Sequence, residues 1–256
     1  MVNTTAIIPI KIDSPKRKEN IDITLRYILQ NTNFDIILTE SDSTQKFNPD
    51  YINSNRIKYR FEKSNNFHRT RLLNEMLNDV KTPVTINYDA DVFLKPESYV
   101  FAEQLILKEK CDLIYPYGYE QFDQRMIQID TDLSLFKKSL NISDIPLSGL
   151  KIGFCRFGHI QFFNTTSYRQ GFMENENYRH WCPEDEERGI RFQKLGYKVG
   201  WFRNLIFHQE HPPSYLPPPE NKKEIYDLHK KLLSFDKQNL IEYYSNQEYL
   251  KKYDTK

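Results

Sequence analysis

The amino-acid sequence predicts an α/β protein with a mostly parallel, mixed sheet flanked by helices. Short apolar segments rich in β-branched residues alternate with segments whose apolar positions recur every three or four residues. Strands that alternate with helices in this way form a largely parallel sheet covered on both faces. A single α/β domain can reach the 256 residues of this chain. We therefore expect one domain over 1–211, with a Pro-rich segment and C-terminal helices over 212–256 packed on the same domain.

The first 115 residues contain the clearest alternation of strand and helix. The segment 67–78 has an apolar stripe at spacings of three and four, formed by Leu72, Leu73, Met76 and Leu77. The apolar run after Thr82 predicts a buried strand that leads into Asp89. We expect the remaining strands over 6–10, 34–39, 57–61 and 112–115, and the remaining helices over 17–29 and 96–108.

The second half is less regular. The segment 183–195 begins with Pro183 and is followed by Gly196, which predicts a helix with defined ends. The run 212–219 holds five prolines, which remove backbone donors and fix φ, so it predicts a linker or lid. Residues 115–148 give little pattern beyond a helix near 132–140. We also expect strands over 159–163, 199–202 and 205–207, and helices over 165–171, 225–235 and 240–249.

Composition narrows the class of protein. The chain has 36 basic and 35 acidic residues, which argues against a nucleic-acid-binding domain. Its three cysteines are widely spaced and predict neither a disulfide framework nor a structural zinc site. The apolar runs are too short for a signal peptide or a membrane span, so we expect a soluble, cytoplasmic protein. Lysine pairs in the C-terminal helices leave peripheral contact with an anionic membrane open, although a solvated helix face is favoured.

Two aspartates follow the buried strand at its carboxyl end. Asp89 and Asp91 are two positions apart, and side chains at that spacing project from the same face of an extended chain. They could therefore converge on one hard divalent ion, with a phosphate-bearing ligand completing its shell. Ligands of open α/β sheets bind at this edge, which favours a nucleotide-sugar site. A surface turn with two solvated aspartates is the alternative.

An acidic cluster stands at the start of the helix expected over 183–195. Glu184 and Asp185 could serve as a general base and as a hydrogen-bonding partner for an incoming hydroxyl. The alternative is structural, because carboxylates are favoured in the first turn of a helix by its dipole. From their spacing alone, the two interpretations are equally supported.

Two further segments offer ligand chemistry. His208 begins the sequence His208-Gln209-Glu210-His211 after an expected strand, and an imidazole that joins carboxylates favours Mn²⁺ over Mg²⁺. Arg69 lies at a helix start, where its guanidinium could pair with diphosphate oxygens. A structural histidine and ordinary surface charge are the alternatives.

These pieces, in this order, resemble the inverting GT-A glycosyltransferases, and most closely the beta-1,4-galactosyltransferase group and bacterial family 2 domains of the chondroitin-polymerase type. The resemblance spans roughly residues 6–211. It is carried by four blocks: Phe67-x-Arg69-x-x-Leu72-Leu73-Asn74, Asp89-Ala90-Asp91, Phe157-Gly158 with Gly171-Phe172 further on, and Trp181-x-x-Glu184-Asp185-Glu186.

The resemblance implies a role for each matched residue. The substrates would be a UDP-sugar donor and a glycan or glycoconjugate acceptor, and the cofactor would be Mn²⁺, with Mg²⁺ possible. The implied roles are metal binding by Asp91 and His208, with Asp89 assisting at the metal or the ribose; nucleotide contact by Arg69; donor-sugar contact by Gly158; catalytic base by Asp185; and acceptor binding by Glu184 and Trp181. Position in such a fold also places Arg17 near the uracil and diphosphate and Glu40 near the nucleoside.

The sequence departs from the family pattern at two places. Cys182-Pro183 stands where two glycines are usual, which stiffens the segment before Glu184. His159 replaces a second glycine beside the donor site, so galactose cannot be assumed as the transferred sugar. The stem and membrane anchor of Golgi enzymes are not seen, which fits a bacterial or viral enzyme.

Two rival functions remain open. A non-catalytic nucleotide-sugar or glycan-binding module would keep the same fold. A sugar nucleotidyltransferase would need a glycine-rich phosphate loop after the first strand, and the segment 11–16 has no glycine, so we rank it lower.

Overall fold

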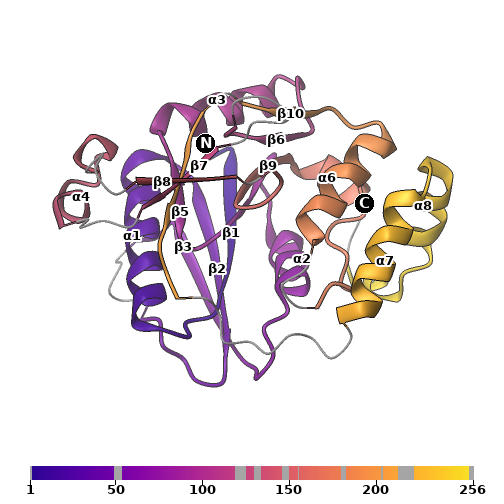
Figure 1. The fold of residues 1–256 in the computed structure, drawn as a ribbon, viewed down its shortest axis with the longest axis horizontal. Helices are drawn as coiled ribbons and strands as arrows, with labels where there is room; N and C mark the ends of the chain where they lie inside the picture. The colour runs from indigo at the N-terminus through magenta and orange to yellow at the C-terminus, as the bar shows by residue number, and fades with distance from the viewer. Residues whose placement is uncertain are drawn as a thin grey trace.

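The computed structural model describes residues 2–48, 54–118, 125–129, 134–145, 150–154, 156–179, 183–202, 204–212 and 222–253. Within these residues, a seven-stranded sheet has the strand order β10-β6-β9-β4-β1-β2-β3 (Figure 1). Its pairings are parallel except where β9 runs antiparallel to β4 and β6. The strands are β1 (Thr4–Ile10), β2 (Asp35–Asp42), β3 (Ile57–Lys63), β4 (Val84–Tyr88), β6 (Leu113–Tyr115), β9 (Ile160–Asn164) and β10 (Val199–Trp201).

The expected α/β class is confirmed, and most of the expected helices are found with small shifts of their ends. Helix α1 begins at Pro15 because the Ser14 side chain caps it by accepting a hydrogen bond from the Arg17 amide. The helices are α1 (Pro15–Asn31), α2 (Arg69–Asp79), α3 (Pro96–Leu107), α4 (Ser134–Ser139), α5 (Thr165–Gln170), α6 (Glu184–Leu195), α7 (Lys222–Ser234) and α8 (Lys237–Ser245), with 3-10 turns η2 (Ile142–Asp144) and η3 (Glu248–Lys252).

A second, four-stranded sheet was not anticipated from the sequence. Its order is β5-β11-β7-β8, and only β11 and β7 are parallel. One of its strands, β7, falls in the part of the chain where the sequence showed little pattern, and β8 follows directly after it. The strands are β5 (Val92–Leu94), β7 (Arg125–Ile129), β8 (Leu150–Phe154) and β11 (Ile206–Gln209).

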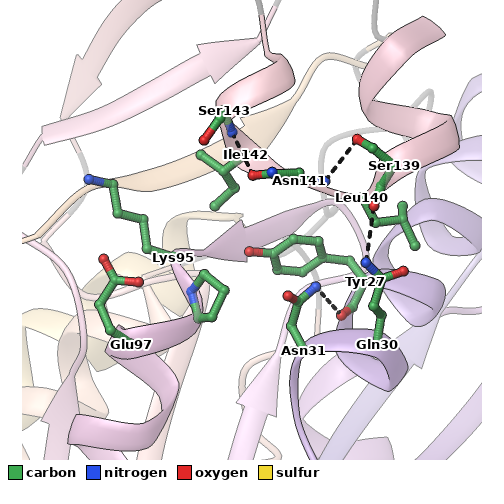
Figure 2. Close-up of a pocket in the computed structure, with 11 residues that line it drawn as sticks. Tyr27, Gln30, Asn31, Lys95, Glu97, Ser139, Leu140, Asn141, Ile142 and Ser143 are labelled. Atoms are coloured by element: carbon green, nitrogen blue, oxygen red, sulfur yellow. Dashed lines mark hydrogen bonds between the residues drawn. The ribbon is translucent and has the colours of Figure 1, made fainter.

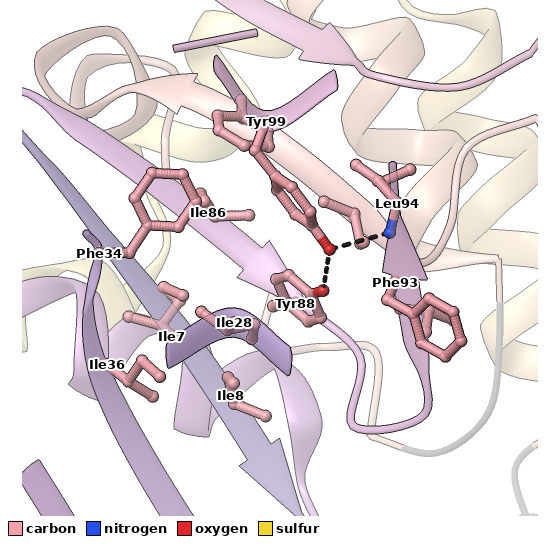
Figure 3. Close-up of a cluster of buried hydrophobic side chains, with 14 of the residues drawn as sticks. Ile7, Ile8, Ile28, Phe34, Ile36, Ile86, Tyr88, Phe93, Leu94 and Tyr99 are labelled. Carbon is pink, nitrogen blue, oxygen red and sulfur yellow. Dashed lines mark hydrogen bonds between the residues drawn. The ribbon is translucent and has the colours of Figure 1, made fainter. Parts of the chain in front are cut away.

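The run from Thr82 to Leu94 therefore forms two strands in two different sheets, and both aspartates lie on the turn between them. Tyr99 of α3 bridges the two strands that flank this turn (Figure 3): its hydroxyl lies 2.6 Å from that of Tyr88 and accepts a hydrogen bond from the Leu94 amide at 2.9 Å. All these groups are fully buried, so the turn is anchored in the core at both ends.

Helices α7 and α8 lie beside α6, at the opposite end of the molecule from α4 (Figure 1). Their buried residues form a small apolar cluster of their own, which includes Tyr178 from the segment before α6. The Tyr244 hydroxyl donates a hydrogen bond to Glu187 of α6 at 2.7 Å. The C-terminal helices thus support α6, whereas the Pro-rich linker or lid expected over 212–219 lies almost entirely outside the described residues.

Candidate functional site

A carboxylate and two imidazoles meet where the two sheets adjoin. Strand β11 pairs antiparallel with β5 so that His208 is opposite Val92, and the Gln209 amide donates to the Asp91 carbonyl at 2.8 Å. This pairing brings His208 Nε2 to 3.8 Å from Asp91 Oδ1. His211, just beyond β11, places its Nε2 at 3.0 Å from Asp91 Oδ2. One ligand atom from each of the three residues lies within 4.8 Å of the others.

The chemistry of this group, which we call the Asp91 triad (Asp91, His208 and His211), fits a divalent transition metal. Burial lowers the pKa of His208 to about 4, so its imidazole is neutral near pH 7 and keeps a lone pair for a cation. Its buried Nδ1 has no hydrogen-bond partner in the described parts of the chain. Burial raises the pKa of Asp91, but the His211 hydrogen bond and the neighbouring His208 outweigh it and lower the pKa overall. Two imidazoles with one carboxylate suit Mn²⁺ better than Mg²⁺ or Ca²⁺.

Asp89 is not part of this triad, although the sequence analysis placed it at the metal or the ribose. Its carboxylate turns the other way: Oδ1 accepts from Arg69 at 2.8 Å, and Oδ2 lies 3.4 Å from His159 Nδ1. Burial raises the pKa of Asp89, yet the Arg69 guanidinium and His159 together outweigh this and hold the pKa well below its usual range. Asp89 therefore remains an anion that orients Arg69 and His159.

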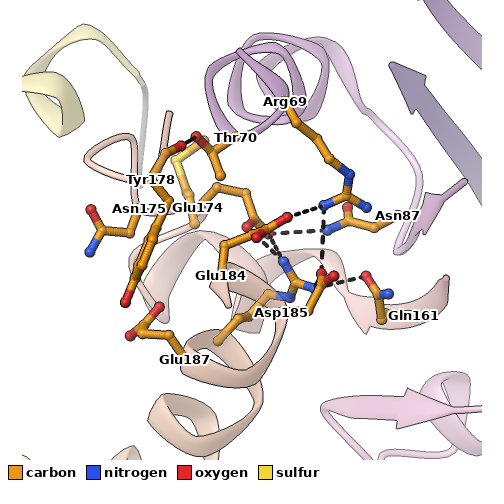
Figure 4. A network of polar contacts seen from close by, with 12 residues as sticks. Arg69, Thr70, Asn87, Gln161, Glu174, Asn175, Tyr178, Glu184, Asp185 and Glu187 are labelled. Carbon is orange, nitrogen blue, oxygen red and sulfur yellow. Dashed lines mark hydrogen bonds and ion pairs between the residues drawn. The ribbon is translucent and has the colours of Figure 1, made fainter. Parts of the chain in front are cut away.

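Arg69 joins Asp89 to the acidic cluster on α6. Its Nη1 lies 3.5 Å from both Glu184 Oε1 and Asp185 Oδ1, and Figure 4 shows these three side chains converging. Arg69 reaches this position from the first turn of α2, whereas Glu184 and Asp185 occupy the first turn of α6. The helix dipole of α6 favours carboxylates there. The two predicted carboxylates and the predicted arginine thus belong to one cluster.

Glu184 is buried beside a second carboxylate. Burial, together with the neighbouring charge of Asp185, raises the pKa of Glu184 to about 8. One carboxyl group of this pair is therefore protonated near neutral pH, and the favoured position for the proton is Glu184. A protonated carboxyl can donate a hydrogen bond to an incoming group, while its neighbour can accept one.

Arg188 supports the pair from inside the protein. It is fully buried on α6, one turn after Glu184, and its guanidinium pairs with Asp185. The same guanidinium contacts both carboxylate oxygens of Glu174, at 2.8 and 2.6 Å, and donates to Gln161 at 3.0 Å. Bidentate contacts of this kind fix the orientation of both side chains and also balance their charges. Neither Arg188 nor Glu174 was predicted from the sequence.

The other residues predicted to contact the donor are Arg17, Gly158 and Glu40, and each makes a different kind of contact. Arg17 lies beside the triad, with Nη1 3.6 Å from Asp91 Oδ2. The carbonyl of Gly158 accepts a hydrogen bond from the Tyr117 hydroxyl. Both carboxylate oxygens of Glu40 are engaged by Tyr59 and by the amides of residues 46 and 47, so in this structure Glu40 holds its own loop. Trp181 and Cys182 lie outside the described residues.

Two histidines of the site were also not assigned from the sequence. His211 had a signal, because it ends the same His-x-x-His segment as His208. His159 had been noted only as a departure from a glycine, and the structure places its ring 5.3 Å from that of His208, measured between centroids. The place of His211 beside Asp91 depends on the pairing of β11 with β5, and the place of His159 beside Asp89 depends on the pairing of β9 with β4.

Two cavities lie away from these residues. One, of about 590 Å³, lies between α1, the start of α3 and η2 and is lined by polar side chains such as Asn31, Lys95 and Asn141 (Figure 2). The other, of about 690 Å³, lies between α2 and the C-terminal helices and includes His68 and Asn246. Neither includes a member of the Asp91 triad or the carboxylates on α6.

The sheet order, its flanking helices and the position of the site at the carboxyl end of β4 define a GT-A fold. A comparison with solved structures finds this fold in TarS of S. aureus. TarS 1–349 in complex with UDP-GlcNAc is 12% identical, with a TM-score of 0.63 over 93% of this chain and 69% of that chain. A second structure of TarS 1–349 is 11% identical, with a TM-score of 0.61 over 93% of this chain and 68% of that chain. A longer TarS structure is 11% identical, with a TM-score of 0.59. That match covers 93% of this chain and 41% of the TarS chain.

Neither the protein-family models nor the curated proteins give a match to this sequence. In the parts of the chain that the structure describes, no helix combines the length and the apolar character that a bilayer span requires. The structural comparison therefore establishes the fold, and the chemistry of the site carries the argument about function.

Proposed function

We propose that this protein is a metal-dependent glycosyltransferase that moves a sugar from a UDP-sugar to a hydroxyl group of a glycan or glycoconjugate, with inversion at the anomeric carbon. The observation that carries the proposal is the arrangement of two sites joined by Arg69. The Asp91 triad lies on one side, beside Asp89, and the carboxylates of Glu184 and Asp185 lie on the other. The fold shared with TarS in complex with UDP-GlcNAc supports a nucleotide-sugar donor.

The Asp91 triad would hold Mn²⁺, which as a Lewis acid supplies charge compensation for a departing diphosphate. Arg17, 3.6 Å from Asp91, and Arg69, which pairs with Asp89, add positive charge near that position. Such groups stabilise the negative charge that grows on the leaving UDP as its bond to the sugar breaks.

We also propose a cytoplasmic location for this protein, as predicted from the sequence.

Asp185 is the base in this scheme. Its carboxylate accepts the proton of the acceptor hydroxyl while the hydroxyl oxygen forms a bond to the anomeric carbon and the bond to the diphosphate oxygen breaks. Arg188 holds Asp185 in place through its guanidinium. Glu184, protonated because its pKa is raised to about 8, donates a hydrogen bond to the acceptor sugar. Attack from the side opposite the leaving group inverts the configuration.

A thermal-shift panel tests the proposal directly. The purified chain is melted with UDP and with UDP-sugars, in Mn²⁺, in Mg²⁺ and after chelation by EDTA. A ligand that binds only the folded state raises the apparent melting temperature, so at least one UDP-sugar should do so in Mn²⁺ and lose the effect in EDTA. UDP release is then followed with an acceptor panel and with water alone.

Three outcomes are informative. Binding that depends on Mn²⁺, together with UDP release, supports the transferase. Binding without turnover on any acceptor or water would favour a non-catalytic module of the same fold. Equal binding with and without metal would contradict the role given to the Asp91 triad.

A further inference from the structure

The cavity of about 690 Å³ between α2 and the C-terminal helices, which we call the α2–η3 pocket, is built from three segments far apart in the sequence. They are the start of α2, the segment 176–179 and the turn from α8 into η3. Its volume lies within the range of pockets that bind small ligands, roughly 300–1,000 Å³. Four of its lining residues carry amides, which place hydrogen-bond donors and acceptors side by side: Asn66, Asn177, Asn246 and Gln247.

Hydrogen bonds between the three segments hold the walls of the pocket in place. The Asn177 side chain donates from Nδ2 to Gln247 Oε1 at 2.9 Å. Glu176 accepts from the Tyr253 hydroxyl at 2.6 Å, just after η3. On the side of α2, His68 Nε2 lies 3.1 Å from the carbonyl oxygen of Glu176. The pocket is therefore formed before any ligand arrives, which lowers the entropy cost of binding.

Several polar groups on these walls are left for a ligand. The Nδ2 groups of Asn177 and Asn246 are used within the protein, but their Oδ1 atoms take part in no hydrogen bond among the described residues. The Arg179 side chain, which is exposed, makes no hydrogen bond or ion pair in the same part of the chain. Acceptors and a donor thus line one pocket.

The charges around the pocket nearly balance. Arg71 is already paired with Glu62 and with Glu75, both at 2.6 Å. Burial lowers the pKa of His68, so its imidazole is neutral near pH 7. An anion would be favoured by a strongly cationic lining, whereas hydroxyl groups, which both donate and accept, suit a nearly neutral one. The charged lining residues are the cations Arg71, Arg179 and Lys252 and the carboxylates Glu176 and Glu248.

The pocket borders the carboxylate cluster on α6 through α2. His68 lines the pocket, and the next residue, Arg69, lies 3.5 Å from both Glu184 and Asp185. Arg179, which also lines the pocket, belongs to the segment that leads into α6. A chain of sugars that presents one hydroxyl to Asp185 can therefore place its further sugars in the pocket.

We propose that the α2–η3 pocket binds the further sugars of an uncharged oligosaccharide acceptor, so that the acceptor is a chain and not a single sugar; this inference rests on the proposed function. The pocket contacts no reacting atom. Its hydrogen bonds are made equally before and during the reaction, and such uniform binding lowers KM without changing kcat.

A glycan array tests whether the protein binds oligosaccharides. The unchanged protein, with UDP and Mn²⁺, is applied to mono- to hexasaccharides of the chitin, cellulose, starch and galactan series and to glycans that carry phosphate or carboxylate groups. We expect binding to at least one uncharged series. NMR titration should show an affinity at least about tenfold higher for its longer members than for its monosaccharide, as hydrogen bonds in the pocket are added.

Two variants place this gain in the pocket. Asn246→Trp fills the pocket from the exposed end of α8, and Arg179→Ala removes its guanidinium. Gln104→Trp, at an exposed position of α3, is the control for the first. Lys95→Ala, which removes a cation that lines the other cavity, is the control for the second. The melting temperature and the affinity for UDP in Mn²⁺ are measured for all four.

In Asn246→Trp and in Arg179→Ala we expect the oligosaccharide to bind about tenfold more weakly, while the affinities for the monosaccharide and for UDP stay within about twofold. Where UDP release is measured, KM for the oligosaccharide should rise with kcat unchanged. Both controls should behave as the unchanged protein does. If Asn246→Trp melts lower than Gln104→Trp, Arg179→Ala decides, since it removes only an exposed side chain.

Three results would each overturn the inference: no binding to any uncharged oligosaccharide, binding confined to the acidic glycans, or full oligosaccharide affinity in Arg179→Ala. All three leave the proposed function intact as long as UDP binds in Mn²⁺ and is released from a UDP-sugar. Failure of the proposed function shows separately, as an absence of Mn²⁺-dependent UDP binding in the unchanged protein, and the inference then fails with it.

Discussion

Arg188 pairs with Asp185 across one turn of α6 while its other contacts are buried entirely in the protein. The same guanidinium holds both oxygens of Glu174, and both of these side chains are at most 1% exposed. Burial raises the pKa of Glu174, but Arg188, the Tyr168 hydrogen bond and the neighbouring arginines together outweigh it and lower the pKa overall, so the pair is ionic. The position of the proposed base therefore depends on a charge that lies inside the core.

We predict that Arg188→Met destabilises the protein by about 3–5 kcal/mol, because it leaves the Glu174 carboxylate buried without its partner. Arg26→Met is the control: Arg26 pairs with Asp22 at 3.1 Å on a partly exposed face of α1, where loss of such a pair costs at most about 1 kcal/mol. Urea unfolding followed by circular dichroism measures both. Equal effects of the two substitutions would contradict the importance assigned to the buried pair.

Because the pKa of Glu184 is raised, we predict that the free energy of unfolding depends on pH. Its pKa is raised from 4.5 to about 8 in the folded state, so between these values the folded protein holds a proton that the unfolded chain releases. The free energy of unfolding should therefore decrease as the pH rises from about 4.5 to about 8 and level off above. Glu184→Gln mimics the protonated form, so it should remove this contribution and be more stable than the unchanged protein at pH 9, by at least about 1 kcal/mol.

Urea unfolding at pH 4, 6, 8 and 9 measures this difference. Glu186→Gln is the control, since Glu186 lies on the same turn but 44% of its side chain is exposed. If the curves of Glu184→Gln and the unchanged protein run parallel over the whole range, Glu184 is ionised in the folded state near neutral pH.

The structure, and not the sequence analysis, predicts that His211 is a third metal ligand. His211→Ala should weaken the Mn²⁺-dependent affinity for UDP by at least about tenfold, a loss that is typical even for residues that only support a ligand. Asp91→Asn should have a similar or larger effect. His229→Gln is the control, because His229 lies on α7 in contact with Tyr178 and Glu186. Calorimetry with and without Mn²⁺ measures the affinity for UDP. An unchanged affinity in His211→Ala would show that His211 is not a metal ligand.

The C-terminal helices offer a test of stability. The Tyr244 hydroxyl is fully buried, donates to Glu187 at 2.7 Å and accepts from Asn175 at 3.1 Å. Tyr244→Phe leaves both groups without this partner and should cost about 1–3 kcal/mol. Tyr226→Phe, at an exposed position on α7, should change the free energy of unfolding by less than about 0.5 kcal/mol. Comparable losses in the two variants would contradict the buried network.

The sequence predicted the main sheet well because its strands are continuous apolar runs separated by amphipathic helices. Strand β1, for example, is buried along its whole length, as expected of a strand covered on both faces. The second sheet could not be predicted, since β5 has only three residues and depends on pairing with β11, more than a hundred residues away. A local sequence pattern does not indicate which distant strand pairs with β5.

The same reasoning explains what was found of the site. Asp91, Asp185 and Arg69 each stand at the end of a strand or the start of a helix, where the sequence pattern itself marks an edge. By contrast, Arg188 lies inside α6 and has the spacing of an ordinary surface arginine, and only the fold shows that this face of the helix is buried. His159 shows no sign in the sequence of its positive φ.

The contacts of α7 and α8 with α6 have a practical consequence for anyone who divides this chain. The prolines between 212 and 219 look like a natural place to cut, since the whole main sheet precedes them. A fragment ending there would keep the strands that the structure describes and the Asp91 triad, yet it would lose the helices that hold Glu187 and Tyr178. Under the proposed function, such a fragment should retain the nucleotide half of the site and lose order around the carboxylates of α6.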